Sequence, residues 1–224
     1  MMAFEMAVIF DMDGVLVDSY QAHWESWHFM AEELGRGLTE EQFIRTFGKT
    51  SREIIAEHWG ENALTPEEIA VFDHRKEGLY REMVANDFPA MDGAKELIQG
   101  LHRAGYGLAI GSSGPPANVA LAVERLNAER LFHTLVTGKD VRRGKPDPEV
   151  FLTAASRLGV PPERCAVVED APVGIAAANA AGMTSIALLS TGHTAKSVAE
   201  ARVIVRSLRD LSPERVRELI SGQA

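Results

Sequence analysis

Cysteine is almost absent from this sequence, and its scarcity excludes a disulfide-stabilised fold. Cys165 is the only cysteine among the 224 residues, so no disulfide bond can form within the chain. Its place in the apolar run CAVV predicts a buried thiol. The seven histidines show no zinc-ligand spacing, which disfavours a zinc site. We therefore expect a reducing compartment, the cytoplasm.

Long apolar stretches and a surplus of positive charge are missing as well. No segment approaches the ~18 consecutive apolar residues of a membrane span, and the start MMAFEMAVIFDMDG has no Lys or Arg before its apolar run, unlike a secretory signal. The formal net charge is −9, which disfavours nucleic acid and anionic membranes, because binding to either needs an excess of Lys and Arg. We expect a monomeric globular protein that binds neither.

Short apolar runs alternate with helical patterns along most of the chain. This alternation predicts a parallel sheet covered by helices on both faces, that is, a Rossmann-like, doubly wound α/β core. Glycines or prolines mark most helix ends. The expected strands span 7–10, 106–111, 134–137, 165–169, 184–189 and 202–205, and the expected helices span 92–103, 115–126, 147–158 (with Pro148 in the first position), 172–181 and 213–220.

Residues 18–87 interrupt this rhythm with four helical patterns and no convincing strand. Capping signatures predict helix starts after Thr39, after Thr50 or Ser51, and after Thr65. All three tryptophans of the chain fall in this segment, and we expect them to fill the core of a small bundle. The sequence thus predicts a four-helix cap inserted into an α/β core made of 1–17 and 88–224. Ligands of open α/β sheets bind beyond the carboxyl ends of the strands, so this insert is a candidate lid.

The stretch FDMDGVLVDS places two aspartates at the end of the first predicted strand. In an extended segment Asp11 and Asp13 point the same way while Met12 faces the interior. Like charges this close are tolerated if a divalent cation lies between them or if one carboxyl is held protonated. A solvated turn remains an equal alternative for an isolated DxDG. A calcium loop of the EF-hand type fails, because Val15 and Ala22 would stand at ligand positions.

A second acidic pair, Glu169 and Asp170, follows another predicted strand in the same manner. If the two strands are neighbours, these oxygen ligands converge on one point and suit Mg²⁺. Ser112 and Ser113 in GSSG, and Lys145 in GKPD, add groups that attract a phosphate at helix starts. Each alone is more often a capped turn, and neither belongs to a Walker P-loop. The four together predict phosphoryl transfer.

Four segments, DMDGVLVDS, GSSG, GKPDPEVF and VVEDAPVGIAAANAAGM, resemble in order and spacing the motifs of the haloacid dehalogenase superfamily, over nearly the whole chain. The resemblance implies that Asp11 is a nucleophile that forms an aspartyl-phosphate, and that Asp13 is the general acid/base. It also implies that Ser112 and Lys145 hold the phosphoryl group. The implied ligands of Mg²⁺ are Asp11, the backbone carbonyl of Asp13, and Asp170 with Glu169 in support.

The position of Asp13 also separates two activities within this superfamily. Its dehalogenases lack an acid there, because they have no leaving alkoxide to protonate. Phosphoryl transfer is therefore favoured over carbon–halogen cleavage.

The predicted cap resembles that of β-phosphoglucomutase. This resemblance implies that Ser19, His23, Arg52 and Lys76 form a hinge, couple closure to Asp13 and bind a distal phosphate. Ordinary alternatives are a packed histidine and solvated basic side chains. Sugar phosphatases share much of this cap, so mutase and hydrolase both stay open.

The sequence leaves three hypotheses for the function of this protein. The leading hypothesis is a Mg²⁺-dependent phosphatase acting on a small phosphorylated metabolite, a sugar phosphate in class. The second is a β-phosphoglucomutase that uses the same aspartyl-phosphate. A catalytically silent binding protein is disfavoured, since a cluster of like charges costs stability when no metal is bound.

Overall fold

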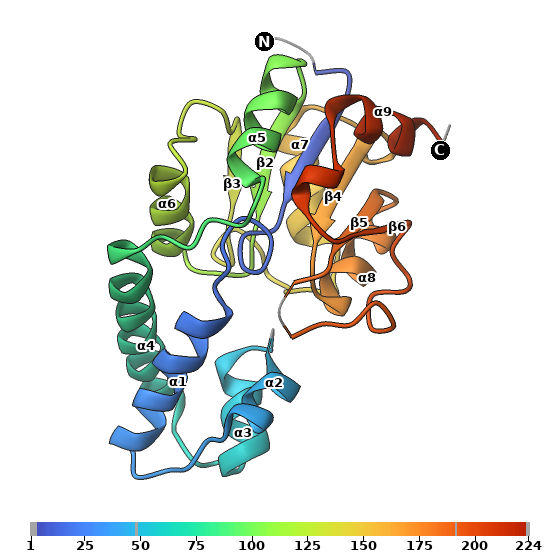
Figure 1. Cartoon of the computed structure of the whole chain (residues 1–224). Coiled ribbons are helices and arrows are strands. Elements are labelled where there is room, and N and C mark those ends of the chain that lie inside the picture. The colour runs from blue at the N-terminus through green and yellow to red at the C-terminus, as the bar shows by residue number, and fades with distance from the viewer. Residues whose placement is uncertain (1–3, 48, 191, 223–224) are drawn as a thin grey trace. The chain divides into compact units, whose positions relative to one another are not determined.

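The computed structural model describes residues 4–47, 49–190 and 192–222. The chain forms two compact units, one made of Met1–Asp18 with Pro89–Ala224 and the other of Ser19–Phe88 (Figure 1). The first unit is the α/β core and the second is helical.

A six-stranded, all-parallel sheet forms the centre of the first unit (Figure 1). Its strand order is β3-β2-β1-β4-β5-β6. All six predicted strands are confirmed, each to within about one residue at its ends, as expected for assignment of element boundaries. The strands are β1 (Ala7–Phe10), β2 (Gly107–Gly111), β3 (Thr134–Val136), β4 (Cys165–Glu169), β5 (Thr184–Leu188) and β6 (Val203–Val205).

Helices cover both faces of this sheet, as the alternating pattern predicted. On one face α7 packs against β1, β2 and β3 beside α8, and on the other α5 and α9 pack together (Figure 1). The helices of this unit are α5 (Ala94–Arg103), α6 (Pro116–Arg125), α7 (Glu149–Leu158), α8 (Pro172–Ala180) and α9 (Pro213–Ser221), with short 3-10 turns at Pro162–Arg164 and Leu208–Asp210.

Three predicted helix starts were wrong by one or two residues. The helix expected from residue 92 begins at Ala94, because Gly93 has a left-handed φ of +84° that ends helical geometry. Pro115 is extended and α6 begins at Pro116, since a residue that precedes proline is pushed out of the helical region. Pro148 flanks α7 instead of opening it, and its carbonyl accepts the first helical hydrogen bonds.

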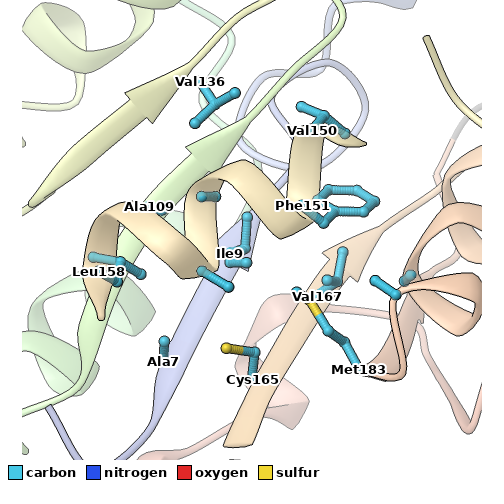
Figure 2. Close-up of a cluster of buried hydrophobic side chains, with 14 of the residues drawn as sticks. Ala7, Ile9, Ala109, Val136, Val150, Phe151, Leu158, Cys165, Val167 and Met183 are labelled. Atoms are coloured by element: carbon cyan, nitrogen blue, oxygen red, sulfur yellow. The ribbon is translucent and has the colours of Figure 1, made fainter. Parts of the chain in front are cut away.

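The core between the sheet and α7 follows the two-residue alternation of the strands. Ala7 and Ile9 of β1 point toward α7, where Phe151 lies fully buried among them (Figure 2). Cys165 of β4 is buried in the same cluster, which confirms the predicted core thiol. Burial, with a contribution from Glu163, raises the pKa of this thiol to about 12.

The second unit consists of four helices, and no strand lies among its described residues. Full capping boxes at Thr39, Thr50 and Thr65 confirm the predicted starts and select Thr50 over Ser51. Trp27 is buried in the core of this unit, and Trp24 and Trp59 pack against it, as predicted. The helices are α1 (Tyr20–Glu33), α2 (Glu40–Thr46), α3 (Ser51–Trp59) and α4 (Pro66–Asn86).

Two backbone hydrogen bonds join the segments of the first unit that precede and follow the helical unit in the sequence. The backbone N–H of Asp18 donates to the Pro89 carbonyl at 2.8 Å, and that of Met91 donates to the Leu16 carbonyl at 3.0 Å. Within the described ranges, no helix is both long enough and apolar enough to cross a membrane.

Candidate active site

The strand order brings the predicted site residues of the first unit to one edge of the sheet. Strand β1 lies between β2 and β4, and Phe10 is level with Ile110 on one side and Val168 on the other. The chain reverses its direction across the sheet between β1 and β4, and such switch points are where open α/β sheets bind ligands. The residues after Phe10, Ile110 and Val168 therefore share one edge.

Asp11 occupies the centre of this edge. Its backbone N–H donates to the carbonyl of Val168 at 2.9 Å, which continues the ladder one residue past β1. The residue is 7% exposed, and its side-chain Oδ1 accepts from Lys145 Nζ at 2.6 Å. Burial, and secondarily Glu169 and Asp13, raise the pKa of Asp11 to about 7 against the opposing effect of Lys145. Its ionised form thus depends on a nearby cation.

The turn after β1 orients Asp13. The backbone N–H groups of Leu16 and Val17 donate to the Met12 carbonyl at 2.8 and 3.1 Å, and Gly14 adopts a φ of +74° that favours glycine. Met12 is fully buried and Asp13 is half-buried, as the alternation predicted. The turn therefore sends the Asp13 side chain away from the core.

Ser112 lies across from Asp13, just beyond β2. Its backbone N–H donates to Val136 O at 3.0 Å, and its buried Oγ accepts from the Gly114 N–H at 3.0 Å. A Cβ added to Gly114 would stand 3.2 Å from Ser112 Oγ and 3.7 Å from Asp13 Oδ2. The hydroxyl and the carboxylate thus flank the same glycine. The side chain of Ser113 is exposed, and its role stays a prediction.

Lys145 joins the two acidic pairs. Its Nζ donates to Asp11 Oδ1 at 2.6 Å and to Glu169 Oε1 at 2.7 Å, and it lies 4.9 Å from the centre of the Phe151 ring. Burial alone would lower the pKa of Lys145, but the two carboxylates outweigh it and the net pKa is raised. The ammonium group therefore stays charged and fixed between them.

Glu169 and Asp170 lie side by side in the sequence but make different contacts. Glu169 Oε2 accepts from the backbone N–H groups of Asp170 at 2.7 Å and Ala171 at 2.6 Å, while its Oε1 is bound to Lys145. Asp170 Oδ2 accepts from Ser190 Oγ at 2.6 Å. Burial, Glu169 and Asp11 raise the pKa of Asp170 well above its usual value. Glu169 thus accepts hydrogen bonds at both carboxylate oxygens, whereas Asp170 has one hydroxyl donor and two neighbouring carboxylates.

Three of these carboxylates could hold a metal ion. One oxygen from each of Asp11, Glu169 and Asp170 lies within 4.8 Å of the other two, and all three residues are buried. Clustered carboxylate oxygens are the donor set that Mg²⁺ uses. Burial, and secondarily the neighbouring carboxylates, raise the pKa values of Asp11 and Asp170, so a cation bound between them would favour their ionised forms.

Three residues with a part in this geometry were missed in the sequence: Gly174, Ser190 and Phe151. A Cβ on Gly174 would stand only 1.7 Å from Glu169 Oε1, so glycine makes room for that carboxylate. The available signal was the position of Gly174 inside a predicted helix, where glycine is about 1 kcal/mol less favourable than alanine. Ser190 and Phe151 carried no local signal, because their partners are distant in the sequence.

The four residues expected from the cap lie in the second unit. The Ser19 hydroxyl is buried without a hydrogen-bond partner in the described chain, and Arg52 is exposed in the first turn of α3. The His23 ring stacks on Tyr80 with centroids 4.2 Å apart. Lys76 is buried and paired with Glu77. Their roles stay predictions.

Comparison with known proteins relates most of the chain to one family. A model of the haloacid dehalogenase-like hydrolase family matches residues 5–182. Validoxylamine A 7'-phosphate phosphatase from Streptomyces hygroscopicus subsp. limoneus is 35% identical over 212 residues, covering 91% of this chain and 94% of the relative. The β-phosphoglucomutase of Bacillus subtilis is 30% identical over 221 residues, covering 95% of this chain and 94% of the relative.

The fold of this chain is also found in experimentally solved structures. A crystal structure of β-phosphoglucomutase from Clostridium difficile aligns with a TM-score of 0.86 over 98% of both chains, at 23% identity. The sequence comparisons and the fold comparison point to the same family as the motifs found at the edge of the sheet. The chain belongs to the haloacid dehalogenase-like hydrolase family.

Proposed function

We propose that this chain is a Mg²⁺-dependent phosphatase that hydrolyses a small phosphorylated metabolite, a sugar phosphate in class, through an aspartyl-phosphate on Asp11. Phosphoryl transfer follows from the family to which the chain belongs. The observation that carries the finer proposal is the placement of Asp11, which contacts Lys145 at 2.6 Å within a buried cluster that includes Glu169 and Asp170. A nucleophile, a cationic clamp and candidate metal ligands thus lie together.

The donor set at this site fits Mg²⁺. Asp11, Asp170 and the backbone carbonyl of Asp13 are the proposed ligands, with Glu169 in support. When bound, the ion would offset the negative charge of the carboxylates and of the phosphate. Glu169 supports the site mainly by holding Lys145, because its other oxygen is bound to two backbone N–H groups.

The residues divide the chemistry as follows. The Asp11 carboxylate attacks phosphorus, the P–O bond to the substrate breaks, and Asp13 gives its proton to the leaving oxygen. Ionised Asp13 then takes a proton from the water that attacks the aspartyl-phosphate, which releases phosphate and regenerates Asp11. Lys145 and Ser112 hold the oxygens of the transferring group.

The substrate class rests on relatives and on the second unit. The relative that is 35% identical is named for a phosphorylated compound, validoxylamine A 7'-phosphate. Another, from Thermotoga maritima and 33% identical over 184 residues, is named phosphorylated carbohydrates phosphatase. We propose that residues 18–87 form a lid. Its Ser19, His23, Arg52 and Lys76, together with Ser113 of the core, are the proposed substrate contacts.

A β-phosphoglucomutase is the second candidate, favoured by the 30% identity to the Bacillus subtilis enzyme over 95% of this chain. It would use the same aspartyl-phosphate and differ in its acceptor, which is a sugar hydroxyl instead of water. Transfer to a sugar requires that water be excluded from the intermediate.

A panel of sugar phosphates tests these proposals. It includes β-glucose 1-phosphate with a trace of glucose 1,6-bisphosphate, and free phosphate and glucose 6-phosphate are both measured. Phosphate release alone supports the phosphatase, and glucose 6-phosphate without phosphate release supports the mutase.

Two controls test the chemistry itself. Asp11→Asn should retain its fold by circular dichroism and lose turnover, and appreciable residual activity would mean that water attacks the substrate directly. Chelation of divalent cations should stop the reaction and added Mg²⁺ should restore it; an unaffected rate would exclude the metal from the mechanism.

A further inference from the structure

Ser190 reaches the acidic cluster from a strand that none of the predicted site motifs includes. It lies two residues beyond β5, which pairs with β4 so that Glu169 is level with Ala187. The backbone N–H of Leu189 donates to Val205 O at 2.9 Å, which ties the start of this loop to β6. The Ser190 hydroxyl then donates to Asp170 Oδ2 at 2.6 Å, the short distance typical of a hydrogen bond to a carboxylate.

The turn after β1 also approaches this carboxylate oxygen closely. A Cβ on Gly14 would stand 1.9 Å from Asp170 Oδ2 and 3.1 Å from Ser190 Oγ. Asp170 itself is 3% exposed. The oxygen therefore lies against both a glycine backbone and a hydroxyl, so the Asp170 side chain has little freedom to rotate.

From this contact we propose that Ser190 is a positioning residue of the cation site, an inference that rests on the proposed function. Its hydroxyl holds the Asp170 carboxylate in the orientation in which Asp11, Glu169 and Asp170 converge within 4.8 Å. One hydrogen bond leaves the carboxylate most of its acceptor positions. Partners that orient metal ligands in this way typically contribute 10- to 100-fold to metal affinity.

Mg²⁺ binding by the full chain tests this role directly. The affinity is measured by isothermal titration calorimetry and by the Mg²⁺-dependent rise of the melting temperature, for wild type, Ser190→Ala and Ser190→Thr. The matched control is Ser185→Ala in β5, which removes another buried hydroxyl, one that bonds to Asn179 at 2.7 Å. If Ser190→Ala fails to fold, the near-isosteric pair Ser190→Thr and Ser190→Val gives the same comparison.

We expect about 10- to 100-fold weaker Mg²⁺ binding in Ser190→Ala, near-normal binding in Ser190→Thr, and unchanged binding in Ser185→Ala. Saturating Mg²⁺ should return kcat of Ser190→Ala toward the wild-type value, an effect that a merely structural defect would not show. If wild type binds Mg²⁺ and Ser190→Ala binds it with the same affinity, the role of Ser190 is refuted while the proposed metal dependence stands. Absence of Mg²⁺ binding in wild type overturns the proposed metal dependence and the inference with it.

Discussion

A single methyl group at position 174 should disturb the active site by displacing Glu169. Gly174 lies in the first turn of α8, and a Cβ there would stand 1.7 Å from Oε1 and 2.0 Å from Cδ of Glu169. Glu169 is buried and held by Lys145 Nζ at 2.7 Å and by the backbone N–H groups of Asp170 at 2.7 Å and Ala171 at 2.6 Å. Gly174→Ala must therefore displace this carboxylate from its donors.

The size of the effect follows from two opposing contributions. Helix propensity alone favours alanine over glycine by about 1 kcal/mol. Each hydrogen bond to a charged group contributes roughly 1.5–3 kcal/mol, so the loss of two of the three at Glu169 costs about 3–6 kcal/mol on that scale. Net destabilisation of about 2–5 kcal/mol corresponds to a melting temperature lower by roughly 5–15 °C in a chain of this size.

Thermal unfolding by circular dichroism and phosphate release from a sugar phosphate measure the two consequences. Activity should fall as well, because Lys145 loses one of its two carboxylate partners. The matched control is Gly100→Ala in α5, where a Cβ would meet only Pro213, at 3.7 Å; it should be slightly more stable than wild type and fully active. A Gly174→Ala protein as stable and as active as this control would refute the geometry described at Glu169.

Further predictions concern a proton donor, an ion pair and the thiol. Asp13→Ala should lower kcat by roughly 10²- to 10⁴-fold with little change in KM, and a normal kcat in steady-state phosphate release would remove Asp13 from the acid/base role. Arg157, with Thr137, holds the pKa of Asp140 at about 2, below the unfolded value of about 3.9. The ion pair therefore stabilises the folded protein fully above the unfolded pKa of about 3.9, and this stabilisation is lost as the pH falls toward 2. The gap in melting temperature between wild type and Asp140→Asn should narrow over this range, and a gap that is constant with pH would contradict the assignment. Cys165 should not react with a disulfide reagent such as DTNB at pH 8 until the protein is unfolded, because its thiol is buried and its pKa is raised to about 12; rapid labelling of the native protein would contradict its burial.

Much of the fold was predictable because its elements are specified locally. Apolar runs of four to six residues located all six strands, and the capping boxes at Thr39, Thr50 and Thr65 located three helices of the second unit. The errors at Gly93, Pro115 and Pro148 concern residues that flank helices, where one backbone dihedral angle decides the boundary.

The sequence by itself predicted most of the groups of the candidate site: its motifs pointed to Asp11, Asp13, Ser112, Lys145 and the pair Glu169–Asp170. Only the tertiary structure decided which contacts these groups make with one another.

The reason is that these contacts join segments far apart in the chain. The strand order places β1 beside β4, which sets Asp11 near Glu169, and Lys145, from the loop between β3 and α7, bonds to both. Glu169 thereby becomes the partner of a lysine, while Asp170 is held by Ser190, a residue that no motif includes. Local patterns cannot specify such pairs, because the free energy that selects them comes from packing the whole sheet.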